Sequence, residues 1–147
     1  MIEAIDLKRV SVFKDLSNDE LDKIKIYVSE ETFKKGTTLF KEGMRGGVMY
    51  IVKRGEIEIF RKGKPAEISL AKLRVGSFVG EMAMIDEEPR SASARISADA
   101  VLLIITKASF REIITKNAES GNKILLNFLK MLSARLRDTN KKIQTTI

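Results

Sequence analysis

The sequence predicts a mainly β domain with helices at both ends, and three observations support this prediction. Short apolar stretches follow one another from about residue 31 to 105, and glycines separate them at a spacing typical of tight turns in an antiparallel sheet. A capped helical pattern precedes these stretches, and a long helical pattern follows them at about residues 120–145. At 147 residues the chain can bury about two-thirds of its unfolded surface, so we expect one domain over residues 1–147.

The first expected element is a helix that begins after Ser17. Ser17 and Glu20 have the spacing of a capping box, in which each side chain accepts a hydrogen bond from the backbone of the other. Leu16 and Leu21 occupy the flanking positions of a hydrophobic staple, and Ile24 continues the apolar face. This pattern predicts a helix that packs against the rest of the domain.

The central region, about residues 31–105, is expected to form a small barrel or jelly roll. Residues 56–59 alternate polar and apolar side chains, as a half-buried strand does. The expected strands all have short apolar centres bounded by turn residues, and they are Thr37–Phe40, Met49–Val52, Glu56–Phe60, Glu67–Leu70 and Val101–Ile105.

Two helices are expected after this region. Thr106 can cap a helix over Lys107–Thr115, and a longer helix follows at about 120–145. The apolar positions of the long helix are spaced alternately four and three residues apart, with one polar interruption: Leu125, Leu129, Leu132, Leu136, Thr139 and Ile143. A period of 3.5 residues favours a partner helix. We therefore expect a homodimer through this helix; packing of the same face on the β region is the alternative.

The composition argues against catalysis. The chain has no cysteine and no histidine, which excludes disulfides, thiolate and imidazole metal sites, and nucleophiles activated by histidine. No cluster of carboxylates or lysines of a catalytic kind stands out. We expect a protein that binds a ligand, without a metal and without enzymatic activity. The acidic start of the chain and the lack of a long apolar run favour a cytoplasmic protein that does not enter the membrane.

The net charge of +7 is unevenly distributed. Residues 119–147 hold six basic and two acidic residues, which gives +4, and the rest of the chain contributes +3. A basic terminal helix can contact nucleic acid, but a solvated helix face is the favoured explanation. The excess in the body of the chain favours an anionic ligand.

The candidate site lies between residues 76 and 93. It places the carboxylate of Glu81 and the guanidinium of Arg90 nine positions apart. A carboxylate accepts hydrogen bonds from hydroxyl groups, and a guanidinium forms paired bonds with phosphate oxygens. Taken alone, Glu81 could instead stabilise a helix end and Arg90 could be a surface charge.

The neighbours of these two residues favour a small molecule that carries a hydroxyl and a phosphate. Gly80 lets the backbone approach a ligand closely at the start of a short helical turn, where exposed amides favour an anion. Ser91 adds a hydroxyl beside the arginine, and the small side chain of Ala92 leaves room for the ligand.

This stretch also resembles a known family. Residues 76–85 together with Pro89–Ala92 are similar to the phosphate-binding cassette of cyclic nucleotide-binding domains. Residues 36–43 and 49–57 resemble earlier strands of that fold, and residues 135–140 resemble the long helix of catabolite-activator-like members. The resemblance covers about residues 12–143. It implies a double-stranded β-helix (jelly-roll) barrel with an N-terminal helix and a long C-terminal helix.

The resemblance also implies a role for individual residues. Glu81 would accept the ribose 2′-hydroxyl, and Arg90 would pair with the exocyclic oxygens of the cyclic phosphate. The remaining contacts would be made by Gly80, Ser91 and the amides of Met82, Ala83 and Ala92 around the phosphate, and by Thr139 and Asn140 at the purine. A hydroxyl after the arginine fits either cAMP or cGMP in this family. We expect cAMP because residues 135–140 resemble the activator-like helix, and cGMP is the alternative.

The implied function is a sensor or regulatory domain that repositions its C-terminal helix when the nucleotide binds and signals to an effector protein that is not identified. No helix-turn-helix segment follows the long helix, so we do not expect this chain alone to bind DNA. It would be a free-standing sensor or part of a longer protein. Three alternatives stay open: a nucleic-acid-binding regulator that uses the basic helix, a cupin-type enzyme, and a dimer scaffold that keeps the cassette without binding.

Overall fold

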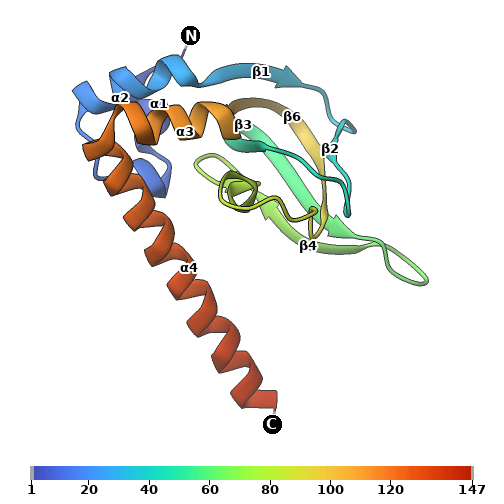
Figure 1. Ribbon diagram of the computed structural model, residues 1–147. Coiled ribbons are helices and arrows are strands. Elements are labelled where there is room, and N and C mark those ends of the chain that lie inside the picture. The colour runs from blue at the N-terminus through green and yellow to red at the C-terminus, as the bar shows by residue number, and fades with distance from the viewer. Residues whose placement is uncertain (1, 147) are drawn as a thin grey trace.

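The computed structural model describes residues 2–146 and shows an antiparallel sheet with helices gathered at one end (Figure 1). The helices are α1 (Ala4–Lys8), α2 (Asn18–Ile24), α3 (Lys107–Lys116) and α4 (Ala118–Thr146). Three short 3₁₀ turns are η1 (Ser11–Phe13), η2 (Lys25–Tyr27) and η3 (Glu81–Met84). The strands are β1 (Ser29–Phe33), β2 (Thr38–Phe40), β3 (Val48–Arg61), β4 (Ile68–Leu73), β5 (Phe78–Val79) and β6 (Ser93–Thr106).

The six strands form one sheet built around β3 and β6. Its hydrogen-bonded order is β1-β6-β3-β4, with β2 paired to β6 and β5 paired to β3, and every pair is antiparallel. The expected mainly β fold with flanking helices is confirmed. Within residues 2–146 this path ends at β1 and β4, so the sheet is open at these edges, and the expected barrel or jelly roll is not closed.

Strand β3 corrects a second expectation. The stretches Met49–Val52 and Glu56–Phe60 were expected as separate strands, but both belong to β3, which passes through Gly55. Gly55 has φ +91°, and a Cβ there would lie 2.3 Å from the carbonyl oxygen of Asp99 on β6. The register between the two strands shifts on either side of this point. Gly55 therefore bends the strand at a bulge and does not end it.

The predicted helix starts are confirmed. Ser17 Oγ accepts a hydrogen bond from the Glu20 amide at 3.2 Å, and Glu20 Oε1 accepts one from the Ser17 amide at 3.0 Å. Thr106 Oγ1 accepts from the Ser109 amide at 3.1 Å and caps α3. Local caps of this kind depend on residues three positions apart, which is why the sequence alone specifies them.

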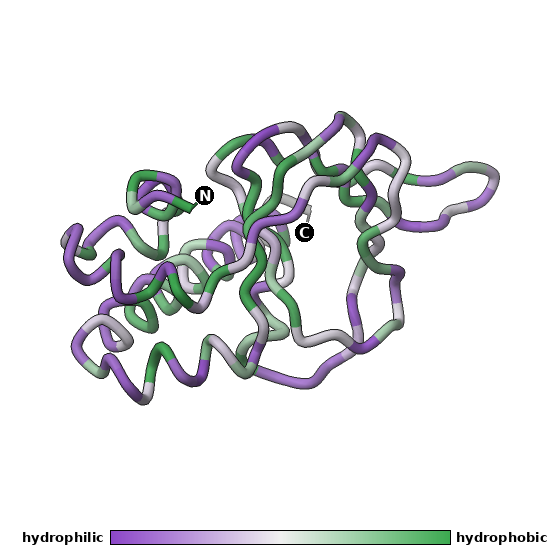
Figure 2. The backbone as a smooth tube through the Cα atoms, turned by 90° about the horizontal axis from the view of Figure 1, so that it is seen from above, coloured by the Kyte–Doolittle hydropathy of each residue, from purple (hydrophilic) through white to green (hydrophobic). Residues whose placement is uncertain are grey.

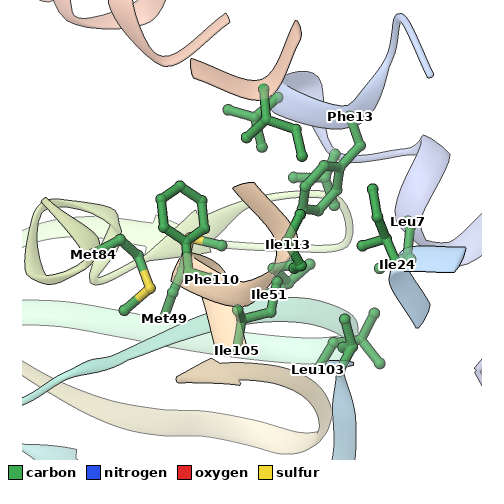
Figure 3. Close-up of a cluster of buried hydrophobic side chains, with 14 of the residues drawn as sticks. Leu7, Phe13, Ile24, Met49, Ile51, Met84, Leu103, Ile105, Phe110 and Ile113 are labelled. Carbon is green, nitrogen blue, oxygen red and sulfur yellow. The ribbon is translucent and has the colours of Figure 1, made fainter. Parts of the chain in front are cut away.

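The larger core cluster lies where the helices cover one end of the sheet (Figure 3). In the view from above, hydrophobic and hydrophilic residues alternate along the helices, and the β3–β4 hairpin extends away from the sheet (Figure 2). The labelled members of the cluster come from the N-terminal helical segments, strands β3 and β6, η3 and α3: Leu7, Phe13, Ile24, Met49, Ile51, Met84, Leu103, Ile105, Phe110 and Ile113. Because Met84 belongs to η3, the candidate site is seated directly on this core.

Helix α4 has two distinct halves. In its first half Ile124 and Phe128 are buried, and Asn127 donates a hydrogen bond to the carbonyl of Val12 at 3.1 Å. Its second half projects away from the helical end and beyond the sheet (Figure 1), and Leu136 and Ile143 are exposed. In the described part of the chain, no helix, α4 included, combines the length and the apolar character needed to cross a membrane.

Candidate functional site

A cavity of about 360 Å³ lies beside the segment that the sequence singled out. Its volume is in the range of small-molecule sites, which is about 300–1,000 Å³. The walls come from β2, β3, β5, the segment after β5, and one residue of α4. The lining residues are Phe40, Ile59, Val79, Gly80, Glu81, Met82, Ala83, Asp86, Glu88, Pro89, Arg90, Ser91, Ala92 and Arg135.

Gly80 makes the turn from β5 into η3. Its φ of +89° is in the left-handed region, which glycine adopts without a steric cost. A Cβ at this position would lie 2.6 Å from Arg90 Nη1 and 2.6 Å from the carbonyl oxygen of Val48. The turn that presents the site therefore needs glycine for its conformation and for the space it leaves to the arginine.

Glu81 is the buried carboxylate of the site, with 7% of its surface exposed. Its Oε1 accepts a short hydrogen bond of 2.5 Å from Nη1 of Arg135, which reaches the site from the second half of α4. Burial of a carboxylate is costly unless it is paired, and Arg135 supplies that pairing. The carboxylate retains further lone pairs that can accept hydrogen bonds from hydroxyl groups.

Arg135 is a residue of this site that the sequence did not lead us to assign. It lies within the 135–140 segment that resembles the family's long helix, but its partner Glu81 is 54 positions away. Nothing in the local spacing joins the two residues. Only one feature of the sequence could have pointed to Arg135: it lies four residues before Thr139, on the same face of the helix.

Arg90 lies half-buried in the opposite part of the site and has no ion pair within residues 2–146. Its Nη2 donates a hydrogen bond of 2.9 Å to the carbonyl oxygen of Val48, and its Cζ lies 4.2 Å from the centroid of the Phe40 ring. Nε is buried without a hydrogen-bond partner. Burial lowers the pKa of Arg90 below its ordinary value, although a guanidinium stays protonated in proteins. The site therefore presents a positive charge that no carboxylate neutralises.

The backbone around Arg90 is fixed by an earlier loop. The Arg90 amide donates to the carbonyl of Met44 at 2.8 Å, and the Gly43 amide donates to the carbonyl of Arg90 at 2.8 Å. Ser91 is exposed and Ala92 is buried, and both line the same cavity. The β2–β3 loop thus holds the arginine in place from outside the segment that the sequence identified.

The structure brings most of the candidate residues together and leaves two apart. Gly80–Ala83 and Arg90–Ala92 line one cavity. The Ala83 amide donates to the carbonyl of Gly80 at 3.1 Å within η3. Thr139 and Asn140 are exposed on α4 beyond Arg135 and do not line the cavity, and Thr139 Oγ1 donates to the carbonyl of Arg135 at 3.0 Å.

A second cavity of about 320 Å³ lies on the other side of η3, between the β2–β3 loop and the start of α3. Its two cations, Arg45 and Lys107, are matched in number by the carboxylates of Asp86 and Glu87. Lys107 Nζ lies 3.5 Å from Glu87 Oε1 and 3.4 Å from the carbonyl of Asp86. The charge is therefore already compensated there. The cavity beside Arg90 is the one whose chemistry calls for an anion.

The arrangement can hold a molecule with three chemically different parts. An anionic group would meet Arg90, a hydroxyl would meet Glu81, and an apolar ring would lie against Phe40, Ile59 and Val79.

Comparisons with known proteins point to the same chemistry. The family model for "Cyclic nucleotide-binding domain" matches residues 30–117. The cyclic AMP receptor protein of Thermus thermophilus is 28% identical over 138 residues, which are 93% of this chain and 62% of the receptor. The cAMP-dependent protein kinase regulatory subunit of Yarrowia lipolytica is 28% identical over 108 residues, which are 74% of this chain and 28% of the subunit.

The similarity extends to the three-dimensional fold. A crystal structure of a cyclic nucleotide-binding domain from Methylobacillus flagellatus superposes with a TM-score of 0.82 at 25% identity, over 98% of this chain and 85% of that one. The chain spans 62% and 28% of the lengths of the two relatives above, so it corresponds to one part of such proteins. Because the family model covers more than half of it, the chain belongs to the cyclic nucleotide-binding domain family.

Proposed function

We propose that this chain binds cAMP in the cavity between Glu81 and Arg90 and works as a regulatory sensor without catalytic activity. The observation that carries the proposal is the guanidinium of Arg90, which is held by a carbonyl and a ring but has no carboxylate partner in the described residues. A cation in such a place is stabilised by a bound anion. The names of the two curated relatives support cAMP as that anion.

The nucleotide would use the three parts of the cavity separately. Its cyclic phosphate would bind Arg90, with Ser91 and the amides of Met82 and Ala92 completing the contacts. Glu81 would accept the ribose 2′-hydroxyl. The purine would lie against the apolar wall, where Thr139 and Asn140 would reach it from α4 after the helix moves.

The signal would pass through α4. Arg135 of α4 holds Glu81 through an ion pair, and the ribose would need the same carboxylate. The ligand and α4 therefore act on one group, and a ligand that binds one position of the helix more tightly shifts the population toward it. This contact supports movement of α4 as the output.

A homodimer through α4 fits the exposed part of the helix. Leu129, Leu136 and Ile143 are 63%, 62% and 52% exposed and fall on the heptad face predicted from the sequence. Burial of this face against a second copy would remove apolar surface from water. The effector protein, the cytoplasmic location and the assignment of residues 1–147 to one domain stay predictions from the sequence.

Isothermal titration calorimetry of the purified chain with cAMP and with cGMP tests the proposal. We expect saturable binding of cAMP at micromolar concentration, and at least a hundredfold weaker binding by the Arg90→Ala variant, because charge-assisted hydrogen bonds to phosphate are lost. Arg95→Ala is the matched control and should bind as the natural chain does. Tighter binding of cGMP would reassign the ligand, and no heat with either nucleotide would refute the proposal.

A further inference from the structure

We propose that Phe40 is a positioning residue for anion recognition: its ring holds the guanidinium of Arg90 in the cavity wall without neutralising its charge. This inference rests on the proposed function. Phe40 ends strand β2, lies 50 positions before Arg90 in the sequence, and belongs to neither the turn at Gly80 nor the segment after it.

The ring and the guanidinium are in direct contact. Arg90 Cζ lies 4.2 Å from the ring centroid, within the distance at which a cation is attracted to the face of an aromatic ring, about 6 Å. Phe40 is 9% exposed and lines the cavity, so its ring is both a wall for the ligand and a support for the arginine. Tyr50 packs beside it with ring centroids 6.3 Å apart and planes 24° apart, which restricts the orientation of the ring.

The other groups around the guanidinium leave it little freedom. Val48 accepts a hydrogen bond from Nη2. A Cβ at Gly46 would lie 2.8 Å from Nη2, and one at Gly80 would lie 2.6 Å from Nη1. The guanidinium therefore occupies a slot between two glycines, with the Phe40 ring and a carbonyl oxygen as its attractive contacts.

The groups that hold the guanidinium in this slot carry no net charge, and this has a functional consequence. A carboxylate partner would fix the arginine equally well but would also cancel its charge and compete with a phosphate. An aromatic ring attracts the cation through its quadrupole while carrying no net charge. The arginine is thus positioned before the ligand arrives, and its full charge stays available to the phosphate.

A second pair in the chain provides a matched control. Arg95 Cζ lies 4.1 Å from the Phe60 ring centroid, and Phe60 is 8% exposed, almost the same values as for Phe40. Arg95, however, has ion pairs of 2.7 Å with Glu58 and 2.8 Å with Glu67. Phe60 does not line the cavity, so its replacement removes a similar contact and a similar buried ring without touching the site.

The experiment compares Phe40→Leu, Phe40→Tyr and Phe60→Leu by calorimetric titration with cAMP. We expect Phe40→Leu to raise the Kd about tenfold, whereas Phe40→Tyr keeps the aromatic face and stays within about twofold of the natural chain. Phe60→Leu should leave the Kd unchanged while lowering the melting temperature about as much as Phe40→Leu does. Binding by Phe40→Leu that equals that of the natural chain would overturn the inference and leave the proposed function intact.

A measurement on the ligand-free chain separates the two proposals. In an NMR spectrum that resolves arginine Nε–H groups, the Arg90 signal, assigned with Arg90→Lys, should be shifted upfield by the ring current of Phe40. Phe40→Leu should abolish this shift, and Phe60→Leu should preserve it. If the natural chain binds neither nucleotide, the proposed function fails and this signal still decides whether Phe40 positions the arginine; an Arg90 signal that Phe40→Leu does not move overturns the inference.

Discussion

Arg90 and Arg95 lie five residues apart and each stacks on a phenylalanine at nearly the same distance, 4.2 and 4.1 Å. Their surroundings differ in one respect. Arg95 lies between the carboxylates of Glu58 and Glu67, whose hydrogen bonds raise its pKa, whereas Arg90 has no carboxylate at ion-pair distance in residues 2–146. Arg95 connects neighbouring strands of the sheet, whereas Arg90 is the arginine that the proposed function assigns to an anionic ligand. The comparison suggests a rule for such a site: the local contacts of the arginine fix its position but do not neutralise its charge.

The largest expected effect comes from filling the space that Arg90 occupies. Gly80→Ala should lower the free energy of unfolding by about 2–4 kcal/mol, because the left-handed conformation becomes strained and the new Cβ collides with Nη1 and with the Val48 carbonyl. Gly36 has a similar φ of +94° but no atom within 4 Å of an added Cβ. Gly36→Ala should therefore show the strain alone, about 1–2 kcal/mol in chemical denaturation.

Titration of the same two variants with cAMP completes this prediction. Gly80→Ala should bind more than tenfold more weakly because the guanidinium is displaced, whereas Gly36→Ala should keep the natural affinity. Equal affinities for the two variants would mean that the position of Arg90 does not control binding.

A smaller effect is expected at the other end of the site. Glu81→Gln should raise the Kd for cAMP at least tenfold, because a hydrogen bond to a charged acceptor is weakened. The same substitution should make no difference to 2′-deoxy-cAMP, which lacks the hydroxyl. Asp86→Asn removes another carboxylate that lines the cavity and serves as the control; a loss there as large as at Glu81 would show a general effect of charge and not a specific contact.

The Arg135–Glu81 contact predicts a change in motion. Arg135→Gln should increase hydrogen exchange of backbone amides several-fold in the second half of α4, because the ion pair that joins this half to the site is removed. Arg137→Gln on the same exposed part of the helix should leave exchange unchanged. Equal exchange in both variants would remove Arg135 as the link between the ligand and α4.

The smallest effect is expected at Glu20, which pairs with Lys123 of the same chain, as Arg95 pairs with Glu58 and Glu67. Hydrogen bonds from Lys123, Ser120 and the Ser17 amide lower the pKa of Glu20 from 4.5 to about 2. Above pH 4.5 the carboxylate is charged in both the folded and unfolded chain and contributes its full stabilisation. Between pH 4.5 and 2 the unfolded chain takes up the proton first, so the contribution is lost as the pH falls.

Urea denaturation of the natural chain and of Glu20→Gln checks this window. The difference in unfolding free energy should be constant near neutral pH and disappear progressively below pH 4.5. A difference that persists unchanged at pH 2 would contradict the assignment of the low pKa to Glu20. This pair anchors the first half of α4, so cAMP affinity should be little affected.

The sequence predicted those parts of the molecule that depend on neighbouring residues. The caps at Ser17 and Thr106 follow from spacings of three residues, and the turn at Gly80 follows from a glycine before a short helical segment. Two details of the sheet were not predicted, because pairing between distant strands decides them. Gly55 bends β3 where it faces Asp99, and the sheet stays open at β1 and β4.

The same limit applies to the site. Glu81 and Arg90 were found from the residues around them, but their partners were not. Phe40 lies 50 positions before Arg90, and Arg135 lies 54 positions after Glu81. A contact across such a separation depends on how β2 and α4 are placed against the segment after β5, and local spacing carries no information about that placement.

The most direct test of the difference between the two arginines is an NMR titration of the natural chain with cAMP that follows their Nε–H signals. We predict that the Arg90 signal moves strongly and saturates at one nucleotide per chain, because a phosphate joins a guanidinium that has no anionic partner, while the Arg95 signal stays in place. Saturable binding that leaves the Arg90 signal unmoved, or that moves the Arg95 signal instead, would contradict the account.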